Sequence, residues 1–361
     1  MHGHDVIVIG TSAGGVEALT QIARGLPREL PAAILVVMHV SEYAPSVLPQ
    51  ILGRSSALPV KHATDGEPIT QGQMFVAPPG AHLLVEKGHV RLAAGPRENR
   101  FRPAIDPLFR TAALAYGPRV VGVVLTGALN DGTAGLLAIK RRGGLAIVQD
   151  PQEAMMPSMP TSALAYVAVD QCLRLAEIPD YLAKIALEPA ATESSEPAPE
   201  DMRVEADISG LSANRRMEGD RVGQLSPYTC PECKGPLWEI HDGQLLRFRC
   251  QVGHAYTSDA LLDDQAEAID DALWTALETL EQRAAIARRL AERSHKSGHS
   301  AAARRFDVQA REMAAKLRTV QRALQGNMSG AQSAANVEWT ERIEQEDHAE
   351  EQSAYGAGEP S

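Results

Sequence analysis

Short, uninterrupted apolar runs alternate with helical or turn-like segments in the N-terminal half of the chain. The runs are DVIVIG from residue 5, AILVVMH from 33, QMFVAP from 73, VVGVVLTG from 120 and LAIV from 145. Continuous Val, Ile and Leu are typical of parallel strands that helices cover on both faces. One such helix is expected from about Gly15, since Val16, Leu19 and Ile22 share a face. We therefore predict an α/β domain over residues 1–187, with a doubly wound, mostly parallel sheet in three layers.

The composition changes after residue 187. Residues 188–201 carry five acidic residues, three prolines and no base, a composition that cannot bury a core. We predict a largely disordered linker over 188–226, then a small zinc-ribbon-like β module over 227–258. An α-helical hairpin or coiled coil is expected over 259–325, and an acidic disordered tail over 326–361.

Charge and hydropathy exclude two classes of partner. The net charge of −11 argues against nucleic acid, because neutralising phosphates needs clustered Lys and Arg. No stretch of 18 apolar residues occurs, so insertion into a membrane is not expected. The first apolar run, Val6 to Ile9, is too short for a secretory signal. The expected location is the cytoplasm.

The first apolar run leads into the loop Gly10-Thr11-Ser12-Ala13-Gly14-Gly15. This loop matches G-x-S-x-G, and backbone N–H groups at a helix start can stabilise an oxyanion. A Rossmann loop would need glycine where Ser12 stands, and a P-loop would need a Gly-Lys-Ser/Thr sequence that is absent. A phosphate loop, or a plain turn capped by serine, remains open from this segment alone.

Two further residues complete the pattern of a nucleophile, a base and an orienting acid. His39 ends the second apolar run, and Asp131 follows the fourth in the loop Ala128-Leu129-Asn130-Asp131-Gly132. In a parallel sheet these positions share the carboxyl edge with Ser12. A serine hydroxyl needs a base to take its proton, and an imidazole needs a carboxylate to orient it. The joint placement favours a triad, although each residue alone is common in structural roles.

Residues 5–187 resemble the catalytic domain of the chemotaxis protein-glutamate methylesterase (CheB-type) family. The resemblance rests on five ordered segments: GTSAGG, VVMHV, LTGALNDGTAG, Arg102-Pro103-Ala104-Ile105-Asp106-Pro107-Leu108-Phe109 and Met159-Pro160. It implies that Ser12 is the nucleophile, His39 the base and Asp131 the orienting acid. It further implies hydrolysis of methyl glutamate esters on chemoreceptor helices with release of methanol, and possible deamidation of glutamine. No cofactor is implied for this catalysis.

The oxyanion and substrate positions carried over from the family are Ala13, Gly14, Ala128, Arg102 and Met159. The family has methionine where Ala128 stands and often threonine where Ala13 stands. A backbone N–H donor survives both changes, so the departures affect substrate preference and rate before they affect the triad.

Family members usually begin with a phosphoacceptor receiver domain that masks the active site. This sequence starts at the first catalytic strand. The expectation is therefore a catalytic domain without the receiver, controlled in some other way.

The cysteines form the pattern C-x₂-C-x₁₆-C-x₃-H with Cys230, Cys233, Cys250 and His254. Two close pairs separated by a hairpin are typical of tetrahedral zinc, and four protein ligands close the site. A structural zinc ion is the favoured interpretation. A redox Cys-x-x-Cys and a metal-free module remain the alternatives, and His241 is a rival ligand with less suitable spacing.

The C-terminal helices carry a heptad-like seam, a spacing that suits packing as a hairpin and dimerisation. The seam comprises Phe306, Ala310, Met313, Leu317, Val320 and Leu324, with a weaker version at Ile269, Leu273, Ala276 and Leu280. Three functions are weighed. The first is a methylesterase acting on methylated, chemoreceptor-like helical proteins. The second is a pseudoenzyme or receptor-binding adaptor that signals through its C-terminal module, and the third is another serine hydrolase.

Overall fold

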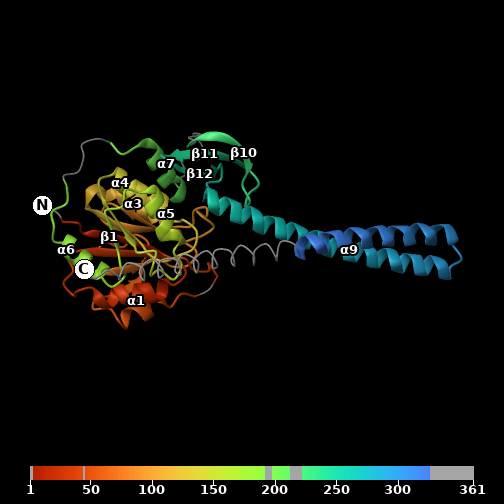
Figure 1. The fold of residues 1–361 in the computed structure, drawn as a ribbon, viewed down its shortest axis with the longest axis horizontal. Helices are drawn as coiled ribbons and strands as arrows, with labels where there is room; N and C mark the ends of the chain where they lie inside the picture. The colour runs from red at the N-terminus through yellow and green to blue at the C-terminus, as the bar shows by residue number, and fades with distance from the viewer. Residues whose placement is uncertain (1–2, 44, 192–196, 212–221, 326–361) are drawn as a thin grey trace, which may run out of the picture. The chain divides into compact units, whose positions relative to one another are not determined.

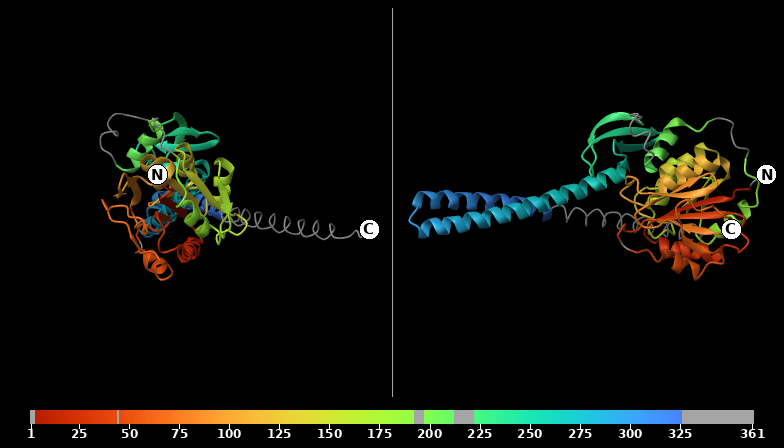
Figure 2. Two further views of the ribbon diagram at one scale, coloured as in Figure 1. Left: turned by 90° about the vertical axis from the view of Figure 1, so that its left-hand side faces the viewer. Right: turned by 180° about the vertical axis from the view of Figure 1, so that it is seen from behind.

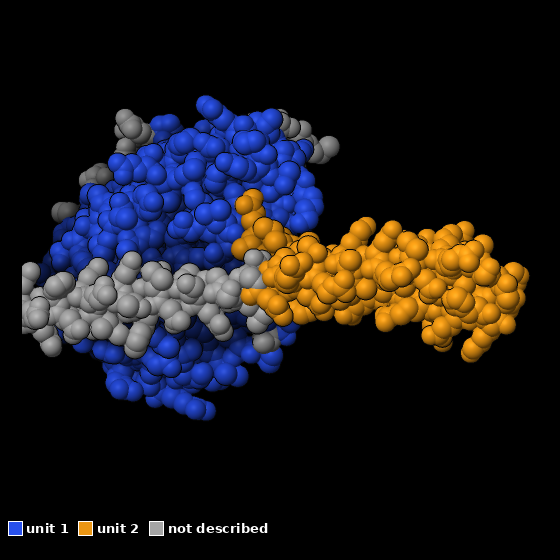
Figure 3. All heavy atoms as spheres, turned by 45° about the vertical axis from the view of Figure 1, so that its right-hand side comes forward, with its two compact units in different colours: residues 1–264 blue, residues 265–361 orange. Residues whose placement is uncertain are grey.

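The computed structural model describes all residues except 1–2, 44, 192–196, 212–221 and 326–361. The chain divides into two compact units, residues 1–264 and 265–361, coloured separately in Figure 3. The acidic tail predicted over 326–361 lies outside the described residues.

The first unit is built on a parallel sheet, as predicted for residues 1–187. Its seven strands within the described residues follow the order β3-β4-β2-β1-β7-β8-β9, with every pair parallel. All five predicted runs form strands, whereas the short edge strands β3 and β9 were not predicted. The strands are β1 (Val6–Thr11), β2 (Ala33–Met38), β3 (Val60–His62), β4 (Met74–Val76), β7 (Val120–Val124), β8 (Leu145–Gln149) and β9 (Gln171–Leu173).

Helices cover both faces of this sheet (Figure 1). On β1, Val6 and Val8 pack in the layer of α3, α4 and α5, whereas Ile7 and Ile9 pack in the layer of α1, α2 and α6. Burial on both faces explains why the apolar runs are uninterrupted. The helices are α1 (Gly15–Gly25), α2 (Leu48–Gly53), α3 (Ile105–Tyr116), α4 (Thr133–Arg141), α5 (Ser158–Tyr166) and α6 (Ile178–Ile185). A hairpin of β5 (His82–Glu86) and β6 (His89–Ala93) and a 3-10 turn at Gly117–Arg119 complete the domain.

The central strand β1 has β2 on one side and β7 on the other. The chain order reverses at this point, where open α/β sheets place their binding crevice. The carboxyl ends of these three strands carry the loops of the three predicted catalytic residues.

The expectation of a largely disordered linker over 188–226 is wrong for residues 200–209. These form helix α7 (Glu200–Ser209), in which Met202 and Val204 are buried. Glu205 is also buried, in contact with arginines. An acid-rich segment can fold in this way because other parts of the chain supply the compensating charges.

The predicted β module is a four-stranded antiparallel sheet, which we call the ribbon, and it belongs to the same compact unit as the parallel sheet. Its first strand begins three residues before the predicted boundary of 227. Its core contains Leu237, Phe248, Tyr256 and Leu261 beside the cysteines. The strands are β10 (Gln224–Thr229), β11 (Pro236–Asp242), β12 (Leu245–Cys250) and β13 (Ala255–Thr257).

The second unit contains the predicted helical hairpin, seen from two further sides in Figure 2. Helix α9 (Ser258–Lys296) begins in the first unit, and residues 300–325 form the returning helix. Gly298, with a φ of 75°, lies at the bend. The seam residue Ile269 is 55% exposed, so the weaker half of the predicted seam is only partly buried. Among the described residues, no helix combines the length and apolar character needed to cross a bilayer.

We expect Met202→Ala to lower the free energy of unfolding by about 2–5 kcal/mol, because it leaves a cavity in the core. Urea denaturation of the full chain measures this change. Arg203→Ala is the matched control, since Arg203 is 41% exposed and its pair with Glu200 spans 3.7 Å. An unchanged midpoint for Met202→Ala would show that α7 does not pack on the domain.

Candidate active site and metal centre

The three predicted catalytic side chains meet at the carboxyl edge of the sheet. Nδ1 of His39 lies 3.1 Å from Ser12 Oγ, and Nε2 of His39 lies 2.7 Å from Asp131 Oδ2. An ionised carboxylate only accepts, so Nε2 carries the proton and Nδ1 can take one from Ser12. The two ring nitrogens therefore have exchanged partners relative to the chymotrypsin-type triad, within the same chain of hydrogen bonds.

Ser12 is held in the turn between β1 and α1. Its N–H donates to Thr126 O at 3.0 Å, and Thr11 Oγ1 donates to the same carbonyl at 2.8 Å. Gly127, which follows Thr126, has no room for a side chain. A Cβ there would lie 2.8 Å from Ser12 Cβ and 2.1 Å from Met159 Sδ. Glycine at position 127 therefore allows this backbone to approach Ser12 closely.

Asp131 is buried and accepts several hydrogen bonds besides the one from His39. The donors are the N–H of Ile105 at 2.7 Å, Nδ2 of Asn99 at 2.9 Å, the N–H of Gly132 at 3.0 Å and the N–H of Asp106 at 3.2 Å. Burial alone raises the pKa of Asp131, but the hydrogen bond and charge of His39 and the other donors outweigh it. The pKa of Asp131 therefore lies below its usual range, and the carboxylate is ionised.

A second buried carboxyl group, Asp106, lies in the first turn of α3. Its Oδ1 accepts from the N–H of Gly132 at 3.0 Å and of Gly135 at 2.6 Å. Burial, followed by the negative charge of Asp131, raises the pKa of Asp106 to about 8. At pH 7 Asp106 is therefore protonated and neutral, whereas Asp131, the partner of His39, carries a negative charge.

Besides the backbone donors to Asp131, the side chains of Phe101 and Asn99, both outside the predicted set, contact His39 and Asp131. The ring of Phe101 stacks on His39, with centroids 3.6 Å apart and planes 8° from parallel. Asn99 donates to Asp131. Phe101 directly precedes the family-like segment that begins at Arg102, and this adjacency is the sequence signal that points to it, whereas Asn99 lies three residues before that segment.

A cavity of about 570 Å³ opens over Ser12 and His39. Two arginines on its wall, Arg97 and Arg102, pair with Glu42 at 2.5 and 2.9 Å. These pairs offset part of the positive charge on the wall. The lining residues are Ser12 to Glu17, Met38 to Tyr43, Arg97, Arg100, Phe101 and Arg102.

Of the five positions predicted to bind the oxyanion or substrate, Ala13, Gly14 and Arg102 line this cavity. Ala128 is not among its lining residues. Met159 is fully buried, and its N–H donates to the carbonyl of residue 127 at 2.9 Å. The prediction of substrate contact is therefore wrong for Met159, because α5 packs this side chain beneath the nucleophile turn.

Five buried charged residues join the catalytic domain, α7 and the ribbon, and we call them the charge cluster. Glu98 lies 2.9 Å from Arg110 on α3 and 3.2 Å from Arg249 on β12. Glu205 on α7 lies 3.2 Å from Arg110 and 3.0 Å from Arg247 on β12. Burial raises the pKa of both glutamates, but the arginines outweigh it, so the pKa of Glu98 is well below its usual range and that of Glu205 falls to about 2.

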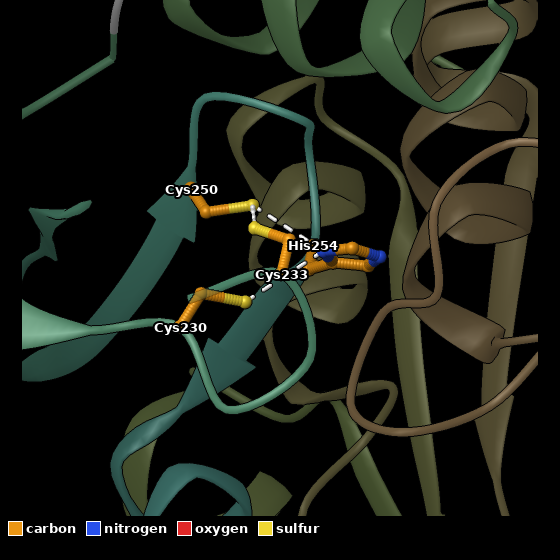
Figure 4. Close-up of side chains that lie close together, drawn as sticks. All are labelled: Cys230, Cys233, Cys250 and His254. Atoms are coloured by element: carbon orange, nitrogen blue, oxygen red, sulfur yellow. Dashed lines mark hydrogen bonds between the residues drawn. The ribbon is translucent and has the colours of Figure 1, made fainter. Parts of the chain in front are cut away.

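The four predicted metal ligands lie together at one end of the ribbon (Figure 4). Their ligand atoms are all within 4.8 Å of one another. Cys250 Sγ lies 3.6 Å from Cys233 Sγ and 3.4 Å from His254 Nδ1, and Cys230 Sγ lies 3.6 Å from the same nitrogen. Zn–S bonds of about 2.3 Å in a tetrahedron place neighbouring sulfurs about 3.8 Å apart. The donor set and its spacing therefore fit zinc.

The surroundings of the ligands support this fit. Nε2 of His254 lies 3.1 Å from Glu232 Oε2, and metal-binding histidines commonly have such a carboxylate on their second nitrogen. The rival ligand His241 is exposed on β11 and pairs with Glu239 at 2.7 Å. It is not part of the ligand group.

Replacing Asp106 tests its protonation. A buried carboxyl group with a raised pKa stabilises the fold below its unfolded pKa of about 3.9, and this contribution is lost as pH rises towards 8. Asp106→Asn removes the dependence. The stability of the variant relative to wild type should therefore rise between pH 5 and 8, by at most about 1.4 kcal/mol per pH unit. Urea titrations at each pH measure this, and a constant difference would contradict it.

Comparisons with known proteins identify relatives of the N-terminal domain. A family model described as CheB methylesterase matches residues 7–182. A putative protein-glutamate methylesterase/protein-glutamine glutaminase of Leptospira interrogans is 40% identical over 183 residues, covering 50% of this chain and 95% of that protein. Protein-glutamate methylesterase/protein-glutamine glutaminase 2 of Anaeromyxobacter dehalogenans is 40% identical over 181 residues, covering 50% of this chain and 53% of that protein.

Among solved structures, the CheB methylesterase catalytic domain of Thermotoga maritima is 34% identical, with a TM-score of 0.49, covering 51% of this chain and 99% of that chain. The Leptospira relative is matched over nearly its whole length at 40% identity. On that relationship, the chain belongs to the CheB methylesterase family.

Proposed function

We propose that the N-terminal domain is a protein-glutamate methylesterase that hydrolyses methyl glutamate esters on chemoreceptor-like helical proteins. The observation that carries the proposal is the continuous hydrogen-bonded path from Ser12 through His39 to Asp131, at the mouth of a cavity, in a member of this family. An ester side chain that enters the cavity reaches the serine oxygen.

In the first half of the reaction, Ser12 Oγ attacks the ester carbonyl while His39 Nδ1 takes the hydroxyl proton. Asp131 stabilises the imidazolium that forms. The N–H groups of Ala13 and Gly14, in the turn at the start of α1, are the proposed donors to the tetrahedral oxyanion. Collapse of this intermediate breaks the bond to the methoxy group, which takes the proton from His39 and leaves as methanol.

In the second half, water attacks the acyl group on Ser12 and gives a proton to His39. The ester bond to the serine breaks, the proton returns to Oγ, and a glutamate carboxylate is released with a proton to solvent. Glutamine presents an amide at the same place, so the same steps would release ammonia. Deamidation is thus a second proposed activity of the site.

We further propose that the reaction takes place in the cytoplasm on methylated receptor helices, and that the C-terminal helices mediate dimerisation. The heptad-like seam supports the second of these. Neither changes the chemistry at Ser12.

Ser12→Ala should reduce methanol release from radiomethylated chemoreceptor membranes by roughly a thousandfold or more, because the nucleophile is lost. Ser46→Ala, which changes a serine outside the triad, is the matched control. Equal release by wild type and Ser12→Ala would refute the assignment of the nucleophile. A wild-type protein that binds the receptor but releases no methanol would favour the adaptor alternative.

For the ribbon we propose one structural zinc ion held by Cys230, Cys233, Cys250 and His254. A closed set of four protein ligands leaves no position for substrate, so the metal would stabilise the ribbon and would not contact the reacting ester.

Elemental analysis of the purified full chain should give about one zinc per chain. Cys233→Ser should lower this content because it removes one ligand, whereas His241→Asn should leave it unchanged. A metal-free wild-type chain with an intact ribbon, judged by its circular dichroism and melting curve, would rule the zinc proposal out.

A further inference from the structure

Residues 97–101 lie between the ribbon and the triad and contact both. On the ribbon side, the N–H of Ala255 donates to Arg97 O at 3.2 Å, and the N–H of Asn99 donates to Ala255 O at 2.8 Å. The segment therefore extends the ribbon sheet beyond β13. On the triad side, Phe101 stacks on His39.

The side chain of Asn99 connects the two sides directly. Its Oδ1 accepts from the N–H of Thr257 on β13 at 3.0 Å, and its Nδ2 donates to Asp131 Oδ1 at 2.9 Å. An amide has an acceptor end and a donor end. Because the backbone of Thr257 engages the acceptor end, the donor end faces the catalytic carboxylate. The ribbon thus sets the orientation of a group that binds Asp131.

The loop that carries Asp131 has a second tie to the ribbon. Asn130 directly precedes Asp131, and the hydroxyl of Thr257 donates a short hydrogen bond to Oδ1 of Asn130. Nδ2 of Asn130 donates to Asp259 Oδ2 at 2.9 Å, at the start of α9. Thr257 therefore contacts both segments that position the carboxylate, with its N–H on one and its hydroxyl on the other.

Two ribbon residues that contact residues 97–101 lie next to proposed metal ligands. Arg249, which pairs with Glu98, directly precedes Cys250, and Ala255 directly follows His254. The loop between the two ligands joins β12 to β13. The pairing of β12 with β13 brings Ala255 and Thr257 to the active site, and holding the two ligands together adds a constraint to the turn that sets its register.

We propose that the ribbon is a positioning element of the active site, and that occupancy of its Cys₃His site by zinc sets the rate of catalysis through Thr257, Asn99 and Asn130. The inference rests on the proposed triad and on the proposed zinc site. Thr257 is a positioning residue, since it acts on Asp131 through the two asparagines and touches no reacting atom.

A ribbon that positions Asp131 predicts different kinetics from a ribbon that only stabilises the fold. Loss of orientation at Asp131 weakens the stabilisation of imidazolium, which develops only during reaction, so kcat should fall. The cavity wall over Ser12 keeps its lining residues, so KM should change little. A change that merely loosened the domain would lower the fraction of active protein and the melting temperature together.

The test uses the full chain with Thr257→Val, which removes the hydroxyl and keeps the branched shape, and Thr257→Ser, which restores the hydroxyl. The first measurement is the rate at which a fluorophosphonate probe labels Ser12, and the second is kcat and KM for methyl-ester hydrolysis. We expect Thr257→Val to slow labelling and kcat by roughly tenfold, with KM and zinc content unchanged. Thr257→Ser should behave like wild type.

The metal is tested by the ligand variant Cys233→Ser beside its control His241→Asn, and by chelation of wild-type zinc followed by its return. Loss of zinc should slow labelling of Ser12 and increase hydrogen exchange in residues 97–106 and 128–133. Adding zinc back should reverse both. Labelling at the wild-type rate in Thr257→Val, or in a zinc-free chain, would overturn the proposal.

These experiments distinguish a failure of this inference from a failure of the two proposals on which it rests. If the wild type labels at Ser12 but releases no methanol, the substrate assignment fails and the labelling comparison still decides the inference. If Ser12 is not labelled at all, the triad assignment fails, and unchanged hydrogen exchange in Thr257→Val then overturns the positioning role. A wild-type chain that contains no zinc would overturn the metal dependence.

Discussion

The charge cluster is the interaction on which the rest of the structure depends. Glu98 and Glu205 are buried among Arg110, Arg247 and Arg249, which come from three parts of the chain far apart in sequence. Buried charges are costly unless they are paired, and separating one partner leaves the other uncompensated in a medium of low dielectric. The catalytic domain, α7 and the ribbon are therefore held together within one compact unit.

The same cluster connects to the chemistry because Glu98 directly precedes Asn99. Asn99 in turn donates a hydrogen bond to Asp131, which is ionised because hydrogen-bond donors surround it. The neighbouring Asp106 is neutral because burial and the negative charge of Asp131 disfavour its ionisation. Two neighbouring buried aspartates thus have different protonation states. The ionised one orients His39, and the neutral one accepts backbone hydrogen bonds without adding to the local negative charge.

Much of this site could be predicted because its signals are local. Ser12 and His39 follow directly on apolar strands, and Asp131 lies in the loop after a third. Parallel strands bring such ends to one edge. The placement of Asn99 could not be predicted in the same way, since its partner Thr257 lies 158 residues away. Met159 was assigned to substrate from its family segment alone, and only the packing of α5 shows that it is buried.

The sequence by itself determined the parallel sheet, the strand-end location of the three proposed catalytic residues and the spacing of the four candidate metal ligands. Each of these is encoded in neighbouring residues, through hydrophobic periodicity or turn chemistry. Only the tertiary structure decided that residues 200–209 fold, that charged side chains such as Glu98 are buried, and that the ribbon lies against the triad. These outcomes depend on compensation between distant residues, and no local pattern in a sequence records which charge will meet which.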